Sequence, residues 1–342
     1  MPSLIITGET VSVRLESEHL ELVKRDPDDQ RGERMIRMRV PLFDVDRCVI
    51  IGRPAMSIPV LQQLMKRGIP TFFLSSRYRW YGALHPDKNM NAERRIRQYQ
   101  LANDHELALK ISKKLVYAKL RNCRRVLQRL SANRSESENP AQVKFAAQIK
   151  NYGRMALIGK SLEEIRGYEG MGTAIYFSRL SDFFPPNVPF KGRNRQPPRD
   201  AANAILSWTY TIVLGELESV IRSHGLDPCI GFLHSVSNGS PSLALDLLEP
   251  LRPALCDMLV MHLLNHKVLT DDDFEFNAED GGTYLAKDSM KEFFMSYEIY
   301  MTRKFTLRRG EDHIDYRKII DSLVIGILKA MEGKEFQFFI MQ

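Results

Sequence analysis

Apolar and polar residues alternate with a period of two through most of the first 84 residues. The segment Val11-Ser-Val-Arg-Leu15 shows this alternation clearly, and it is typical of a strand with one buried face because successive side chains point to opposite sides. Short β-branched runs broken by Gly, Asp and Pro extend the pattern. The expected strands are Leu4–Ile6, Val11–Leu15, Leu20–Lys24, Met35–Val40, Val45–Ile51, Thr71–Leu74 and Tyr78–Leu84.

One helix is expected among these strands. Apolar residues from Val60 to Met65 form a stripe at helical spacing, with Ser57 as the expected N-cap and Gly68 closing the end. Residues 1–84 are therefore expected to form a small, mainly β domain.

Residues 85–92 contain turn residues without periodicity and are expected to be a linker. Beyond them the spacing of apolar residues changes to three and four, as at Val116, Leu120 and Cys123, and no Pro or Gly occurs from Glu93 to Leu130. Residues 93–342 are expected to form a larger all-α domain, so that the fold class is α+β. Further helices are expected at Gln142–Ile158, Leu162–Phe184, Asp200–Ser223, Ser242–His266, Met290–Met301 and Tyr316–Met331.

The positive charge of the chain is concentrated in one segment. Residues 85–160 carry 17 Lys and Arg against 6 Asp and Glu, a net +11, whereas the rest of the chain carries a net −4. This distribution favours a surface that faces a polyanion such as DNA, although a helix that is merely solvated, or that docks against the acidic remainder, would look the same. Six basic residues share one helical face: Lys110, Lys113, Lys114, Arg121, Arg124 and Arg125.

Composition and missing motifs exclude several classes of protein. With 342 residues, 44% apolar and 27% charged, the chain is expected to be globular with about two domains. It has no secretory leader, no run of about 18 apolar residues and no paired cysteine motif, which favours a soluble, cytoplasmic protein with four free thiols and no membrane partner. The phosphate-binding loop, dinucleotide fingerprint, serine-hydrolase elbow and zincin motif are absent from the sequence.

Candidate chemistry lies at four residues within apolar, structured sequence. Glu169 and His234 are each surrounded by apolar residues, and Asp246 and Glu249 are spaced by three, which places both carboxylates on one helical face. Carboxylates with a neutral imidazole suit Mg²⁺ or Mn²⁺. On residue types alone, a core histidine, a surface Glu and an ordinary Asp/Glu pair near a helix start remain an alternative.

A basic, Pro-rich loop precedes one of the expected helices. Residues 190–200 carry four positive charges, including Arg193 and Arg195, and Asp200 is the expected N-cap of the helix that follows. The loop is suited to clamping a backbone phosphate, and a solvated connection between helices is the alternative.

Four motifs stand out in the expected helical domain: Ile165-Arg-Gly-Tyr-Glu169-Gly, Arg195-Gln-Pro-Pro-Arg-Asp200-Ala-Ala-Asn203-Ala-Ile-Leu206, Leu226-Asp-Pro-Cys-Ile-Gly-Phe-Leu-His234 and Pro241-Ser-Leu-Ala-Leu-Asp246-Leu-Leu-Glu249-Pro-Leu-Arg252. Together they resemble the CRISPR adaptation integrase family, CRISPR-associated protein 1, whose members are metal-dependent DNA endonucleases. The motifs occur in the order and separation typical of the family, and the β domain, linker and helical domain match its architecture.

The resemblance implies that Glu169, His234 and Glu249 are the catalytic ligands of Mg²⁺ or Mn²⁺ in the helical domain, with Asp246 auxiliary beside them. It also implies binding of double-stranded DNA, as spacer precursor and repeat array, a homodimer formed through the β domains, and assembly with the small companion, CRISPR-associated protein 2. The implied reaction is attack of a 3′-hydroxyl on a repeat-end phosphate, which inserts a short foreign fragment into the array of a prokaryotic cell. A stand-alone nuclease for branched DNA and a non-catalytic DNA-binding scaffold remain the alternatives.

Overall fold

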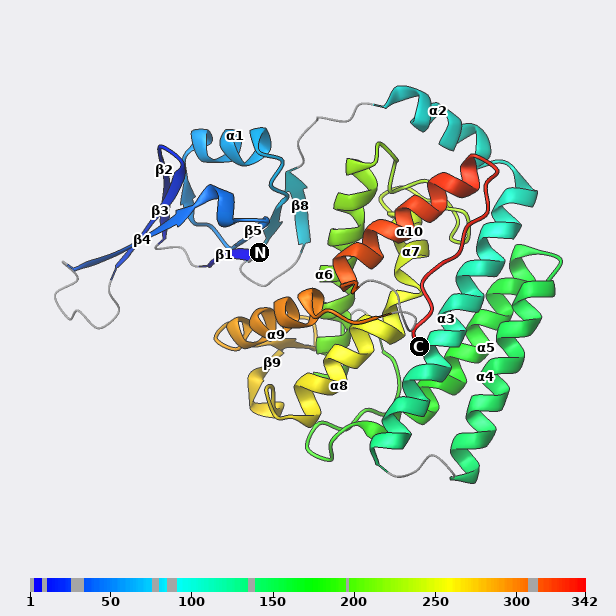
Figure 1. The fold of residues 1–342 in the computed structure, drawn as a ribbon. Helices are drawn as coiled ribbons and strands as arrows, with labels where there is room; N and C mark the ends of the chain where they lie inside the picture. The colour runs from blue at the N-terminus through cyan, green and yellow to red at the C-terminus, as the bar shows by residue number, and fades with distance from the viewer. Residues whose placement is uncertain are drawn as a thin grey trace. The chain divides into compact units, whose positions relative to one another are not determined.

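The chain forms two compact units, Met1–Asn91 and Ala92–Gln342 (Figure 1). The computed structural model describes residues 3–7, 11–25, 34–75, 80–84, 91–134, 139–194, 197–306 and 313–342. Most of the expected linker, residues 85–92, lies outside the described residues, as do the first two residues of the expected strand Tyr78–Leu84.

Two four-stranded sheets make up the N-terminal unit. The first has the order β1-β5-β7-β8, with β8 antiparallel to β7 and the other pairs parallel. The second has the order β4-β3-β2-β6, an antiparallel meander to which the short β6, which the sequence analysis did not anticipate, adds in parallel. The strands are β1 (Ser3–Thr7), β2 (Ser12–Glu16), β3 (His19–Arg25), β4 (Met35–Pro41), β5 (Arg47–Ile51), β6 (Ala55–Met56), β7 (Thr71–Leu74) and β8 (Trp80–Leu84).

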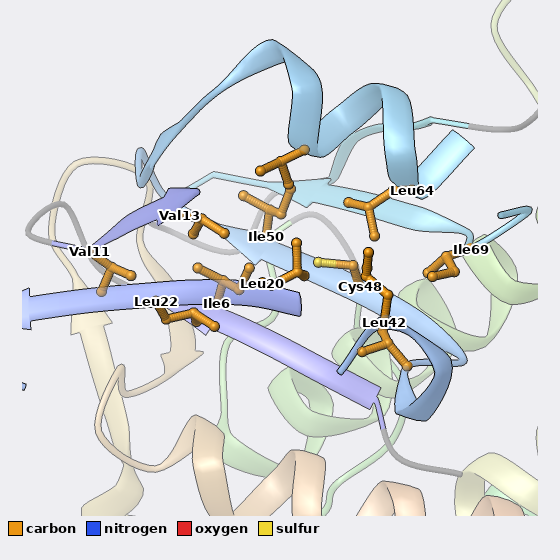
Figure 2. Close-up of a cluster of buried hydrophobic side chains, with 12 residues drawn as sticks. Ile6, Val11, Val13, Leu20, Leu22, Leu42, Cys48, Ile50, Leu64 and Ile69 are labelled. Atoms are coloured by element: carbon orange, nitrogen blue, oxygen red, sulfur yellow. The ribbon is translucent and has the colours of Figure 1, made fainter. Parts of the chain in front are cut away.

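Helix α1 (Ile58–Lys66) and both sheets share one apolar core (Figure 2). Val60 and Leu64 from the expected stripe are fully buried, and Gly68 adopts a positive φ of 72° that ends the helix. Ser57 precedes the helix in an extended conformation, but its side chain makes no capping hydrogen bond. The strands contribute Ile6, Val13, Leu20, Cys48 and Ile50 to this core.

The second unit is mostly helical, and this confirms the expected α+β fold class. Helices α3, α4 and α5 pack against one another (Figure 1). The helices are α2 (Ala92–Leu101), α3 (His105–Asn133), α4 (Pro140–Ile158), α5 (Leu162–Leu180), α6 (Ala201–Ser223), α7 (Ser242–Leu248), α8 (Met258–Asn265), α9 (Met290–Thr302) and α10 (Tyr316–Met331).

Asp200 caps a helix as the sequence predicts, and Ser161 caps another. The Asp200 carboxylate accepts a hydrogen bond from the Asn203 backbone N–H, and the Ser161 hydroxyl accepts one from that of Glu164. Helix α6, which Asp200 starts, is long and apolar enough to cross a membrane by length and composition alone. However, 61% of its most apolar window is buried inside the structure, as in the core helix of a globular protein.

Two stretches expected to be continuous helix are interrupted. Between α2 and α3 the chain turns at Asp104, whose side chain accepts from the Leu107 backbone N–H and starts a new helix. The expected helix Ser242–His266 divides into α7, the π-helix η3 (Arg252–Asp257) and α8. Pro253 lies inside η3, and the proline ring removes a backbone donor that a regular α-helix requires.

A two-stranded antiparallel hairpin interrupts the helices of the second unit, and the sequence analysis did not anticipate it. Its strands are β9 (Phe274–Asn277) and β10 (Gly282–Leu285), and Gly281 in the turn has a φ of +68°. The hairpin precedes α9 and contacts α6.

Close approach of α3 and α5 depends on Gly172. A Cβ at this position would lie 2.6 Å from Leu120 Cδ2, whereas one at Gly170 would meet nothing within 4 Å. Of the two glycines in the Gly170-Met-Gly172 segment, only Gly172 therefore faces the helix contact.

The C-terminal segment after α10 lies along α3 (Figure 1). The buried side chain of Asn122 on α3 donates to the carbonyl oxygens of Phe339 and Pro250 and accepts from the Met341 backbone N–H, at 2.7–3.1 Å. One amide thus joins α3 to the chain terminus and to the segment that follows α7.

Candidate active site

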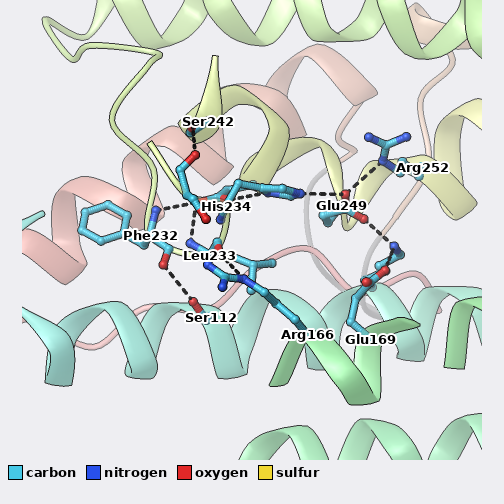
Figure 3. A network of polar contacts seen from close by, with 12 residues as sticks. Ser112, Arg166, Glu169, Phe232, Leu233, His234, Ser242, Glu249 and Arg252 are labelled. Carbon is cyan, nitrogen blue, oxygen red and sulfur yellow. Dashed lines mark hydrogen bonds and ion pairs between the residues drawn. The ribbon is translucent and has the colours of Figure 1, made fainter. Parts of the chain in front are cut away.

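A single buried carboxylate organises the loop that carries His234. Asp246 on α7 is fully buried and accepts hydrogen bonds from three consecutive backbone N–H groups of that loop, at 2.6, 2.9 and 2.9 Å. The loop can approach this closely because residue 231 is glycine, where a Cβ would lie 2.7 Å from the backbone of Ser242. The N–H donors belong to Phe232, Leu233 and His234 (Figure 3).

The imidazole of His234 is oriented by the same carboxylate. Its Nδ1 lies 2.7 Å from Asp246 Oδ1, so Nδ1 carries the proton and Nε2 keeps its lone pair when the ring is neutral. Nε2 lies 4.0 Å from Glu249 Oε1. The hydrogen bond to Asp246 raises the pKa of His234 above its ordinary value, against the opposing effect of burial.

Glu249 lies one turn after Asp246, at the C-terminal end of α7. Its carboxylate is buried between two cations, with Lys119 Nζ at 2.5 Å and Arg252 Nε at 3.1 Å. Burial alone would raise the pKa of Glu249, but Lys119 and Arg252 outweigh it and lower this pKa to about 2. Glu249 is therefore an anion at any physiological pH.

Glu169, on α5, contacts the same lysine as Glu249. Its Oε1 accepts a hydrogen bond of 2.9 Å from the Thr173 hydroxyl and forms an ion pair with the Lys119 ammonium. Lys119 thus bridges Glu169 and Glu249, and the structure brings together all four residues expected at the site: Glu169, His234, Asp246 and Glu249 (Figure 3).

The sequence analysis missed Lys119 as a member of this cluster, although a signal was present. Lys119 follows Val116 by three residues and precedes Cys123 by four, which places it on the apolar stripe of α3. A lysine on such a stripe is rarely buried unless it is paired, and its side chain here is only 6% exposed. Arg252, next to Glu249, was part of a quoted motif but was given no role.

A divalent cation fits the donor set but not the present arrangement of the side chains. Two carboxylates and the free Nε2 of His234 are the ligand types of Mg²⁺ or Mn²⁺ sites. Among the described residues, however, no group of three or more His, Cys, Asp or Glu side chains is close enough together to hold a metal ion. The Lys119 ammonium is the cation that lies between Glu169 and Glu249 in this structure. A metal ion would suit the two carboxylates if it replaced this ammonium.

The six basic residues expected to bind DNA are in two different environments. Lys114 donates to the Phe336 carbonyl oxygen at 2.7 Å and lies over the Phe336 ring, and Lys110 lies over the same ring at 5.7 Å. These two lysines hold the C-terminal segment, so docking within the chain accounts for part of the face. Lys113 is half-buried.

The arginines of this face line two hollows. A hollow of about 840 Å³ lies between α3, α10 and the C-terminal segment and is lined by Arg121, Arg124 and Arg125. Arg121 and Arg124 also line a second hollow between α3 and α4, together with Lys150 and Arg154. No acidic residue is among those that line either hollow in the described parts of the chain.

The basic loop before α6 is partly anchored to its own helix. Arg193 donates to Asn203 Oδ1 at 2.8 Å and to the Ser207 hydroxyl at 3.3 Å, and it lies over the Tyr210 ring. Arg195 lies outside the described residues. The loop thus packs Arg193 against α6, which favours a structural role for this residue.

A further buried carboxylate follows Glu249 and Arg252 in the chain. Asp257, at the end of η3, accepts hydrogen bonds from the Tyr176 and Tyr210 hydroxyls at 2.8 and 2.5 Å. Burial raises the pKa of Asp257 to about 6, against the effect of these hydrogen bonds.

The sequence is similar to a family of CRISPR proteins. The family model described as CRISPR associated protein Cas1 matches residues 4–299. A CRISPR-associated endonuclease Cas1 of Thermodesulfovibrio yellowstonii is 30% identical over 321 residues, covering 94% of this chain and 98% of the relative. One from Thermus thermophilus is 30% identical over 305 residues, covering 89% and 88%.

Solved structures share the fold. A casposase bound to its integration product superimposes with a TM-score of 0.81 at 22% identity, covering 99% of this chain and 93% of the casposase. A Cas1 protein from Thermotoga maritima gives 0.77 at 20% identity, covering 98% of both chains. A Cas6-RT-Cas1–Cas2 complex gives 0.75 at 20% identity, covering 99% of this chain and 36% of the matched one.

Proposed function

The chain belongs to the CRISPR-associated protein Cas1 family, as its motifs indicated, and we propose that it is a divalent-metal-dependent DNA endonuclease and integrase of CRISPR adaptation. The observation that carries the proposal is the arrangement of the three expected ligands: one ammonium group bridges the carboxylates of Glu169 and Glu249, and the Nε2 atom of His234 lies 4.0 Å from Glu249. Its substrate is double-stranded DNA.

The metal supplies positive charge that offsets the repulsion between an incoming nucleophile and an anionic phosphodiester. Neighbouring residues of the protein hold the proposed metal ligands in position. Asp246 fixes the tautomer of His234 so that Nε2 faces the site, and Arg252 holds the Glu249 carboxylate at 3.1 Å. Both carboxylates are carried by packed helices, so the backbone that positions them is in place before substrate binds.

The reaction exchanges one phosphoester bond for another. The 3′-hydroxyl of a short DNA fragment attacks the repeat-end phosphorus, the new P–O bond forms, and the strand's original P–O bond breaks to release a 3′-hydroxyl. No net bond energy is required, which agrees with the absence of an ATP-binding motif in the sequence. Water in place of the 3′-hydroxyl makes the same site a nuclease.

The assembly we propose has three components. The casposase relative is described as bound to an integration product, and another neighbour is a complex of Cas1 with Cas2. By analogy, this chain forms a homodimer through its β unit, binds CRISPR-associated protein 2, and holds spacer and repeat DNA. We place it in the prokaryotic cytoplasm, where its four cysteines, which form no disulfide, remain reduced.

Alanine substitution at the three ligands tests the proposal. Glu169→Ala, His234→Ala and Glu249→Ala should each abolish Mn²⁺- or Mg²⁺-dependent cleavage and joining of labelled oligonucleotides while duplex binding in a gel-shift assay is retained. The exposed Glu163 on the same helix as Glu169 provides the matched control, Glu163→Ala, which should remain active.

Two results would contradict the proposal. Full cleavage activity in EDTA would exclude a divalent metal, and a fully active His234→Ala would remove the imidazole from the site. Duplex binding without any cleavage or joining, under all metals, would instead favour a non-catalytic DNA-binding scaffold. Cleavage of branched DNA without joining would favour a stand-alone nuclease.

A further inference from the structure

Lys119 carries a charge opposite to that of two expected ligands and touches both of them. Its ammonium is within ion-pair distance of both Glu169 and Glu249, and its side chain is 6% exposed. A buried lysine is costly unless each of its donors is satisfied. The two carboxylates therefore stabilise Lys119, and Lys119 stabilises them.

The balance of charge at the site explains why a cation is needed there. Without Lys119, two carboxylates with oxygens directed at one point would repel each other in a poorly solvated environment, leaving Arg252 to offset only Glu249. Burial alone would lower the pKa of Lys119, but Glu249 and Glu169 raise it well above its ordinary value.

We propose that Lys119 is a built-in counter-ion that competes with the divalent cation for Glu169 and Glu249, and that this competition makes metal binding depend on DNA. The proposal rests on the proposed metal site. The same carboxylate oxygens cannot hold the ammonium and a metal ion at once, so Lys119 leaves them when the metal binds. A displaced, buried ammonium needs a new anion, and a DNA phosphate is the anion that the proposed reaction brings to the site.

Two consequences follow for binding. In the absence of DNA, Mn²⁺ binds more weakly than the ligand set alone would allow, because it must displace Lys119. In the presence of DNA, the phosphodiester offsets that cost, so DNA and metal each strengthen the binding of the other by the same factor. Couplings of this kind are typically roughly 5–150-fold.

Titration of the intact chain with Mn²⁺ alone, by calorimetry, tests the competition. Lys119→Met keeps most of the length of the side chain and removes its charge. Lys113 is half-buried on the same helix, so Lys113→Met is the matched control. Lys119→Met should bind Mn²⁺ roughly 5-fold or more tightly than the wild type, and it should melt at a lower temperature in EDTA. It should also lose most of the increase in Mn²⁺ affinity that a short duplex gives the wild type.

The signs of these effects separate the proposal from a purely structural role. A lysine that only supports packing would lower both thermal stability and Mn²⁺ affinity when it is replaced, and such a result would overturn the proposal. Equal Mn²⁺ affinity in Lys119→Met and wild type would also overturn it while leaving the proposed metal site intact. Absence of Mn²⁺ binding by both the wild type and Lys119→Met, with and without a duplex, would overturn the metal site itself, and the competition with it.

A measurement on the unmodified chain covers the case in which Lys119→Met does not fold. Buried, ion-paired lysine ammonium groups give slowly exchanging signals in proton–nitrogen spectra. The Lys119 signal should be present in EDTA and should shift or disappear on addition of diamagnetic Mg²⁺, while signals of exposed lysines stay in place. An ammonium signal that is unchanged at saturating Mg²⁺ would overturn the proposal.

Discussion

The strongest local prediction concerns Asp246, because each of its two oxygens accepts two hydrogen bonds. Oδ2 accepts from the backbone N–H groups of Phe232 and Leu233, and Oδ1 accepts from the N–H and the Nδ1–H of His234. Asp246→Asn keeps the size of the side chain but replaces one oxygen with an NH₂ group. Whichever oxygen is replaced, two donors lose their acceptor, and they are buried at Oδ2 and part-buried at Oδ1.

The expected loss of stability follows from that count. A buried donor without a partner costs about 1–3 kcal/mol, so two of them cost about 2–6 kcal/mol, with a midpoint of about 4 kcal/mol. In a unit of this size about 1 kcal/mol lowers the melting temperature by roughly 2–4 °C. The midpoint therefore corresponds to a fall of roughly 8–16 °C. Asp272→Asn, at an exposed position, should leave the melting temperature unchanged.

Thermal and urea unfolding in EDTA measure this loss without any contribution from bound metal. A second measurement follows the metal, since loss of a group that orients a ligand typically weakens metal affinity or activity by about 10–100-fold. Activity of Asp246→Ala should accordingly fall less than that of the three ligand variants. A stability loss below about 1 kcal/mol in Asp246→Asn would refute the reasoning, because it would mean that the loop does not depend on this carboxylate.

Three further predictions concern pH, packing and salt. Because burial raises the pKa of Asp257 to about 6, the native state holds a proton that the unfolded chain loses near pH 4. Stability should therefore fall by about 3 kcal/mol as pH rises from about 4 to about 6, and urea unfolding of Asp257→Asn should show a flatter profile. Gly172→Ala should lose about 1–3 kcal/mol in urea unfolding because its Cβ would overlap Leu120, whereas Gly170→Ala, with open space, should not. Replacing Arg121 and Arg124 with Glu should weaken binding to all duplexes alike and flatten the slope of log K against log salt by about two units. An unchanged slope would show that α3 does not contact the DNA backbone.

Local periodicity was sufficient to predict most of the secondary structure. The alternation around Val13 and the stripe from Val60 to Met65 each depend on one buried face, and such a face is visible in the order of residues alone. The π-helix η3 and the break at Asp104 were not predicted as interruptions, because the apolar spacing continues across both. Each interruption has a local signal instead: a proline at position 253 inside η3, and Asp104 in the N-cap position of α3.

The site was harder to predict because its members come from four separate segments. Residue types gave the candidates, but only the resemblance to a family made Glu169, His234 and Glu249 a set. Lys119 could be suspected from its position on an apolar stripe, yet its partners are 50 and more residues away in the sequence. The same distance problem applies to Lys114, which is predicted to bind DNA and also contacts Phe336 of the C-terminal segment, 222 residues away in the sequence.

The triple attachment made by Asn122 has a consequence for protein engineering. Because one amide holds both the C-terminal segment and the carbonyl of Pro250, which directly follows Glu249, we expect a change at the end of the chain to reach the Glu249 carboxylate through this side chain. Affinity tags and fluorescent labels are better attached at the N-terminal unit. A fusion at Gln342 that pulls Met341 away from α3 would lower activity without touching any ligand.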